Sequence, residues 1–171
     1  MTSALPDGFA IDLTLQAGDW PDEAHLLRLA ETAIRASVST GGLQVMDNSE
    51  LSLLFTDDAS IRKLNGEWRD KDKPTNVLSF PGSDPVNGRY GPLLGDIVFG
   101  FETVTAEARD MGVDFSDHLS HLTVHGLLHL FDYDHQTDKE AELMEGLEKT
   151  ILASLGIDDP YAGSPLVVEG N

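Results

Sequence analysis

The most informative part of the chain is the run His125-Gly126-Leu127-Leu128-His129-Leu130-Phe131-Asp132-Tyr133-Asp134-His135. Its first two histidines are four positions apart, a spacing that puts both side chains on one face of an α-helix. Leucines fill the positions between and beyond them, which predicts a helix held in the core. The acidic residues that follow predict a turn, from which His135 can return toward the same point. The run therefore predicts three imidazoles around one metal ion.

We expect that metal to be zinc, one ion per chain, bound by His125, His129 and His135. Three protein ligands that leave a fourth tetrahedral position open to water are typical of catalytic zinc. The chain has no cysteine, so a zinc site must be built from histidine and carboxylate. A zinc peptidase of the His-Glu-x-x-His type has its general base directly after the first histidine, where this chain has Gly126.

Two more histidines, His118 and His121, precede these ligands on the same expected helix. At a rise of about 1.5 Å per residue, His121 lies roughly 12 Å from His129, whereas zinc–nitrogen bonds are about 2 Å long. These two residues cannot share one metal ion. We expect His118 and His121 to lie at the surface or to contact the ligands.

The length of 171 residues suits a single domain, which we expect to have its core at about 9–155 and a loose C-terminal tail at 156–171. The sequence has no apolar run long enough to span a bilayer, and its N-terminus lacks the features of a signal peptide. We therefore expect a cytoplasmic protein with no membrane association.

Charge is distributed unevenly along the chain. The net charge of −19 argues against non-specific binding to polyanions, which depends on lysine and arginine. Five of the eleven basic residues nevertheless fall close together, at Arg62, Lys63, Arg69, Lys71 and Lys73. This segment is either a solvated connection or a basic patch in which Arg69 binds phosphate through its planar guanidinium group.

Hydrophobic periodicity and capping residues predict the other elements. We expect strands at about 9–15, 51–55, 77–80 and 93–100, and helices at about 23–38, 57–68, 102–111 and 138–155, besides the histidine helix. The last helix should be acidic outside, with an inner row formed by Met144, Leu147, Ile151 and Leu155. Asp96 interrupts an apolar strand, where it can orient a histidine, hold Arg69 or lie at a strand end.

Three motifs together resemble the bacterial YbeY family over roughly residues 20–155. They are Arg69-x-Lys71-x-Lys73-Pro74-Thr75-Asn76-Val77-Leu78-Ser79-Phe80-Pro81, then Leu94-Gly95-Asp96-Ile97, then the histidine run. The resemblance implies a single-domain α+β fold, with a small mixed β-sheet packed against helices and a histidine helix like that of zinc hydrolases. It further implies that His125, His129 and His135 bind the metal and that Arg69 is the functional arginine.

The function implied by this resemblance is that of a single-strand-specific endoribonuclease. Such an enzyme would act in ribosomal RNA maturation, notably at the 3′ end of 16S rRNA, and in ribosome quality control. Its expected partners are single-stranded RNA, small-subunit ribosomal proteins and a ribosome-associated GTPase, and not DNA. Asp134 and Asp96 are candidates for a general base.

Two other hypotheses remain open from the residues themselves. One is a zinc hydrolase of another substrate, such as a peptide. The other is a ribosome-assembly factor that binds protein and RNA and whose zinc is structural. One departure from the family pattern is Asp132, where the family usually has glycine before Tyr-Asp-His. Aspartate tolerates the left-handed conformation better than most residues, so we expect the turn to be kept.

Overall fold

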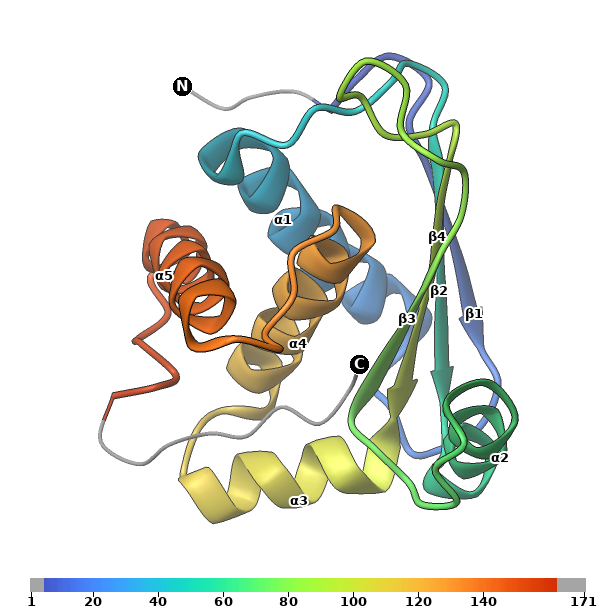
Figure 1. The fold of residues 1–171 in the computed structure, drawn as a ribbon. Coiled ribbons are helices and arrows are strands. Elements are labelled where there is room, and N and C mark those ends of the chain that lie inside the picture. The colour runs from blue at the N-terminus through green and yellow to red at the C-terminus, as the bar shows by residue number, and fades with distance from the viewer. Residues whose placement is uncertain (1–4, 163–171) are drawn as a thin grey trace.

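Residues 5–162, which the computed structural model describes, form four strands and five helices (Figure 1). The strands are β1 (Ala10–Leu15), β2 (Glu50–Thr56), β3 (Val77–Pro81) and β4 (Leu93–Gly100). The helices are α1 (Glu23–Gly41), α2 (Asp58–Arg69), α3 (Phe101–Met111), α4 (Phe115–Leu130) and α5 (Asp138–Ser154). Within the described residues, no helix combines the length and the apolar character needed to cross a membrane.

The strands form one mixed sheet in the order β1-β2-β4-β3. Strands β1, β2 and β4 are parallel, whereas β3 is antiparallel to β4 and forms one edge of the sheet. Ser79 pairs with Ile97 across β3 and β4, and Phe80 pairs with Asp96. Because successive side chains point to opposite faces, these two pairs face opposite sides of the sheet. The sheet confirms the single-domain α+β fold that the resemblance implies.

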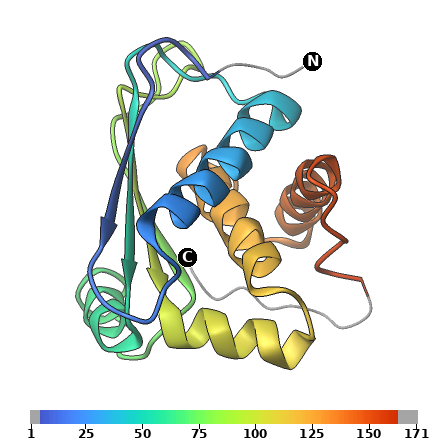
Figure 2. The same ribbon diagram turned by 180° about the vertical axis from the view of Figure 1, so that it is seen from behind.

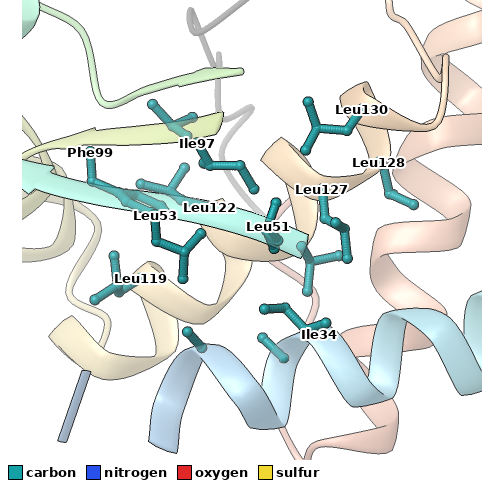
Figure 3. Close-up of a cluster of buried hydrophobic side chains, with 14 of the residues drawn as sticks. Ile34, Leu51, Leu53, Ile97, Phe99, Leu119, Leu122, Leu127, Leu128 and Leu130 are labelled. Atoms are coloured by element: carbon teal, nitrogen blue, oxygen red, sulfur yellow. The ribbon is translucent and has the colours of Figure 1, made fainter. Parts of the chain in front are cut away.

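Helices α1, α4 and α5 lie on one side of the sheet, as the two opposite views in Figures 1 and 2 show. Helix α4 packs on β3 and β4, and α1 and α5 pack against α4. Large aliphatic and aromatic side chains of the sheet meet those of α4 in the main core (Figure 3), among them Leu53, Phe99, Leu119 and Leu122. Each such side chain contributes roughly 1.5–3 kcal/mol when fully buried. On the other side of the sheet, Ile61 of α2 packs against β3 and β4 in a smaller cluster.

Helix α4 is buried along nearly its whole length, and it approaches the sheet closely at Gly126. A Cβ atom on Gly126 would lie 2.9 Å from Cγ2 of Ile97 and 3.1 Å from Oγ of Ser79. Oγ of Ser79 also donates a hydrogen bond of 2.8 Å to the Gly126 carbonyl. Close packing and this bond together fix the helix on the sheet, and with it His125 and His129.

Acidic or hydroxyl side chains cap the starts of α1, α2, α4 and α5. Asp22, Asp57 and Asp114 accept hydrogen bonds from backbone N–H groups in the first turns of α1, α2 and α4. Thr137 begins α5 with a capping box completed by Glu140. Each of these bonds satisfies an N–H that the helix itself leaves unpaired. The cap positions explain why these helix starts could be predicted from the sequence.

Two predictions about side-chain placement are wrong. Asp96 lies in the middle of β4, but it is exposed on the face away from α4, so it needs no buried partner. On α5, the buried residues are Met144, Glu148, Ile151 and Leu152. Glu148 is thus an acid on the inner face of a helix that was expected to be acidic outside.

The expected loose tail at 156–171 is wrong for its first part. Ile157 packs against the main core, and the Tyr161 hydroxyl lies 3.0 Å from a carboxylate oxygen of Glu148. A partly buried apolar side chain and a partly buried hydrogen bond hold this stretch on the helices. The rest of the predicted tail, residues 163–171, lies outside the described residues.

Candidate metal centre

Three imidazole rings converge beside the C-terminal end of α4. The Nε2 atoms of His125 and His129 lie 3.1 Å apart. The ring of His135 has its centroid 5.6 Å from that of His125 and 5.1 Å from that of His129. One nitrogen from each of the three lies within 4.8 Å of the others. Two nitrogens that bind one tetrahedral zinc at about 2.0–2.1 Å are roughly 3.3 Å apart, so this spacing suits a shared ion.

The backbone after α4 brings His135 back to the helix. The helix ends at Leu130, and the Tyr133 N–H donates to the Leu128 carbonyl at 3.1 Å, which turns the chain back. The Asp134 carboxylate then accepts a hydrogen bond of 2.8 Å from the backbone N–H of His135. Asp134 therefore helps to hold the turn that carries the third histidine.

Asp132 has the left-handed conformation that its place in the turn requires, with φ of 69°. This confirms that the turn is kept with aspartate in the usual glycine position. The Asp132 carboxylate accepts a hydrogen bond of 2.7 Å from the Tyr90 hydroxyl. Burial and this bond to Asp132 raise the pKa of Tyr90 to about 12, so its hydroxyl keeps the proton. The Asp132 carboxylate is thus hydrogen-bonded to a tyrosine of the loop between β3 and β4.

The surroundings of His129 favour a neutral imidazole. Burial lowers the pKa of His129 to about 4, with further lowering by nearby His125 and His135. A neutral imidazole has a lone pair for a metal ion, whereas a protonated one has none. Nε2 of His135 is buried and has no hydrogen-bond partner among the described residues. An unpaired buried nitrogen beside two others fits a metal ligand, so the residues present match zinc in both donor type and spacing.

Glu148 of α5 is a residue of this site that sequence reasoning missed. Its side chain is completely buried, and Oε1 lies 3.2 Å from Nδ1 of His125 and 2.7 Å from Nε2 of His121. Burial by itself raises the pKa of Glu148, but the hydrogen bonds from His121 and His125 outweigh burial and lower the pKa to about 2. The carboxylate is therefore ionised and accepts these bonds.

The bond from His125 selects one tautomer of this ring. With its proton on Nδ1 and donated to Glu148, His125 directs the lone pair of Nε2 toward His129 and His135. Tyr161 donates a third hydrogen bond to Oε1 of Glu148, at 3.0 Å. His121, His125 and Glu148 also satisfy the distance criteria for a metal site. Their nitrogen–oxygen distances of 2.7 and 3.2 Å are those of hydrogen bonds, so we interpret the trio as support for His125.

The structure places neither His118 nor His121 at the surface. His118 is buried, with Nε2 at 2.8 Å from a carboxylate oxygen of Glu107, which also accepts from the Asn76 amide. His121 reaches the candidate ligand His125 indirectly, because both rings lie within hydrogen-bond distance of Glu148. Both histidines thus use acids from other helices, whose proximity cannot be recognised from the spacing along α4.

Arg69 ends helix α2 at the free edge of the sheet. Its Nη2 donates a hydrogen bond of 2.8 Å to the Ser79 carbonyl, and its guanidinium carbon lies 5.8 Å from the centre of the Phe80 ring. The Ser79 hydroxyl in turn bonds the Gly126 carbonyl, next to the candidate ligand His125. Arg69 is therefore tied to the strand on which the histidine helix rests. Asp96 faces away from α4, which counts against it as a general base.

Comparisons with known proteins agree with this geometry. A family model described as endoribonuclease YbeY matches residues 16–156. A Sinorhizobium fredii protein named endoribonuclease YbeY is 49% identical, over 92% of this chain and 94% of its own. A protein of the same name from Rhizobium meliloti is 50% identical, over 91% and 96%.

A solved structure shows the same fold. The solution structure of a Thermotoga maritima protein superposes with a TM-score of 0.53 at 23% identity, over 85% of this chain and 91% of that one. The family model spans most of the chain and includes the arginine motif, the three histidines and Glu148. This chain therefore belongs to the YbeY family.

Proposed function

We propose that this chain is a zinc-dependent endoribonuclease that cleaves single-stranded RNA. The observation that carries the proposal is the convergence of His125, His129 and His135 on one point, with His125 oriented by a buried carboxylate. Membership of a family whose curated relatives are named endoribonucleases supplies the reaction class. The natural substrate in this proposal is ribosomal RNA, with cleavage at the 3′ end of 16S rRNA during maturation and in ribosome quality control.

The three histidines are the residues that would hold the zinc ion. When bound, zinc supplies a Lewis acid that polarises a phosphoryl oxygen and lowers the pKa of bound water. His129 is a neutral ligand, because burial keeps its pKa low. Glu148 keeps the proton of His125 on Nδ1, away from the metal side. Asp134 accepts the backbone N–H of His135 and so keeps this ring in position.

Arg69 is the proposed catalytic residue. Its bond to the Ser79 carbonyl uses one of five guanidinium N–H groups and orients the guanidinium plane. The remaining N–H groups can bind the oxygens of a phosphodiester and stabilise the charge that develops on them during cleavage. A positively charged group that is already oriented requires little rearrangement when the substrate binds.

The charge distribution agrees with a nucleic-acid substrate that binds at one place. Arg62, Lys63, Lys71 and Lys73 are exposed and lie close to Arg69 in the sequence, with Arg62 paired to Asp72, whereas the chain as a whole carries a net charge of −19. Negative charge elsewhere disfavours non-specific contacts with RNA and limits binding to this basic segment. We place this activity in the cytoplasm, together with small-subunit ribosomal proteins and a ribosome-associated GTPase.

One observation favours a second function, that of a ribosome-assembly factor. A surface with this much negative charge suits binding to basic proteins, a class that includes ribosomal proteins. In contrast, the structure disfavours the hypothesis of a zinc hydrolase that acts on peptides. Position 126 faces the sheet, where a glutamate in place of Gly126 would collide with Ile97 instead of reaching a substrate.

The test is metal analysis paired with cleavage of a single-stranded RNA, for the parent protein and for His129→Ala. We expect about one zinc per parent chain, and loss of both zinc and cleavage in the variant while circular dichroism shows a retained fold. Loss of zinc with unchanged cleavage would contradict the proposal and identify a contaminating nuclease. Pull-down of small-subunit proteins by the folded variant would then favour the assembly factor.

A further inference from the structure

Trp68 is a large aromatic side chain that lies mostly outside the core. The chain has two tryptophans, and their surroundings differ. Trp20 is 8% exposed, packs edge-on against Phe55 and Phe101, and donates its indole N–H to the Thr56 carbonyl. Trp68, in the last turn of α2, is 68% exposed. Exposure of a large apolar ring in water is unfavourable, which suggests that a ligand covers it.

The neighbours of Trp68 connect it to the proposed site. The Trp68 ring lies edge-on to the Phe80 ring, with centroids 6.1 Å apart. The guanidinium carbon of Arg69 lies over the same Phe80 ring, 5.8 Å from its centre. Arg69 reaches the Ser79 carbonyl, and the Ser79 hydroxyl reaches α4 beside His125. Phe80 and Ser79 face opposite sides of the sheet, so Trp68 and the histidines flank the same free edge of β3.

We infer that Trp68 is a stacking site for an unpaired nucleobase of the RNA, one or more nucleotides away from the phosphate bound by Arg69. This inference rests on the proposed function. An RNA strand that crosses the edge of the sheet at β3 would have its phosphate at the Arg69 guanidinium group. A neighbouring base would then lie on the face of the sheet away from α4, where the Trp68 indole is exposed. Proteins that bind single strands combine aromatic faces with basic side chains in this way.

The charge and the aromatic character of the residues near Trp68 favour a nucleobase as its ligand. The exposed cations Lys63 and Lys71 lie near the indole in the sequence and complement a polyanion, whereas a purely apolar partner would offer them no opposite charge. Arg62 is already paired with Asp72. A flat aromatic ring accepts any base, because every base has a π-face. In a duplex the bases are stacked within the helix, so the site also provides a physical reason for preferring single strands.

The experiment compares zinc-loaded Trp68→Ala and Trp68→Phe with the parent on an unstructured single-stranded RNA. Leu15→Ala is the matched control, because Leu15 is 41% exposed on β1, at the opposite edge of the sheet. We expect Trp68→Ala to raise KM about ten-fold with little change in kcat, and Trp68→Phe to remain within about three-fold of the parent. Leu15→Ala should match the parent.

Tryptophan emission provides a second readout. Mixing with RNA in a stopped-flow instrument should quench the parent emission before cleavage, and Trp68→Phe, which retains only the buried Trp20, should show no quenching. A parental KM for Trp68→Ala together with unchanged parent emission would overturn the inference while the nuclease function stands. Quenching without cleavage would support the stacking site and overturn the proposed function. Neither quenching nor cleavage would overturn both.

Discussion

Nδ1 of His125 lies 3.2 Å from Oε1 of Glu148, and Nε2 of the same ring lies 3.1 Å from Nε2 of His129. The two nitrogens of one imidazole therefore have separate tasks, one toward a buried carboxylate and one toward the other candidate ligands. This carboxylate–histidine arrangement fixes the tautomer and orientation of a metal ligand. It connects helix α5, which carries none of the three histidines, to the geometry of the site.

Replacing Glu148 with glutamine should weaken metal binding without removing a ligand. Glutamine has nearly the same shape but no negative charge, so His125 becomes a poorer and less firmly oriented ligand. We expect zinc affinity, measured by competition with a chromogenic chelator, to fall about 10–100-fold. Glu142→Gln is the control, because Glu142 is an exposed acid on the same helix. Unchanged affinity in Glu148→Gln would show that the bond does not position His125, and two zinc ions per parent chain would show that Glu148 is itself a ligand.

Arg69→Ala should reduce RNA cleavage and leave zinc content unchanged. Loss of a donor that stabilises developing charge costs about 10²–10³-fold in kcat. Arg69→Lys should recover only a small part, because lysine offers a point charge without the planar pair of donors. Single-turnover cleavage, zinc content and thermal unfolding of each variant provide the measurement. If Arg69→Ala also loses zinc or unfolds, the bond to the Ser79 carbonyl is structural and the catalytic assignment is wrong.

The histidine spacing and the capping residues allowed much of the site and fold to be predicted, because both depend on neighbours within one turn of helix. His125 and His129 need only the helical period to be placed on one face, and Asp22, Asp57 and Asp114 cap their helices through backbone N–H groups two or three residues away. These local relations are present in any single sequence.

Glu148 was missed because its role depends on a contact between two helices. It lies four residues after Met144 and three before Ile151, both buried, so its position is on the inner face of α5. The helical period alone therefore carried a signal, which the charge of the residue concealed. Its partners His121 and His125 are 27 and 23 residues away, and Glu107 is likewise brought to His118 by the packing of α3 on α4. Such pairings require the tertiary structure.

The metal-free protein should lose stability as pH falls from about 6.5 to about 4. In the unfolded chain His129 takes up a proton near its ordinary pKa of 6.5, whereas burial lowers the pKa to about 4 in the folded protein. Between these values the unfolded state binds more protons, so the free energy of unfolding decreases as pH decreases. The contribution is on the order of 3 kcal/mol across the whole interval.

Urea denaturation of chelator-treated protein at several pH values measures this effect. His129→Gln removes the titrating group, so its free energy of unfolding should depend less on pH in this interval than that of the parent. The difference between the two proteins isolates His129 from the other histidines. Identical pH dependence in both would mean that His129 titrates normally in the folded protein, which would contradict its burial as the cause of a low pKa.

Gly126→Ala should destabilise the protein and disturb the metal site at the same time. The added Cβ would lie 2.9 Å from Cγ2 of Ile97 and 3.1 Å from Oγ of Ser79, so α4 or the sheet must move. Such overpacking typically costs about 1–3 kcal/mol. The control is Gly146→Ala on α5, where a Cβ meets no atom of the described residues within 4 Å. There alanine should instead stabilise the helix, by up to about 1 kcal/mol.

Thermal unfolding and zinc affinity of these two alanine variants test how the histidine helix is held. A shift of α4 away from the sheet moves His125 and His129 relative to His135, which comes from the loop after the helix, so Gly126→Ala should bind zinc more weakly than the parent. Gly146→Ala should bind zinc as the parent does. A stable Gly126→Ala variant with parental zinc affinity would mean that the sheet accommodates a methyl group at this position. The close contact with Ile97 and Ser79 would then not be what sets the position of the two histidines.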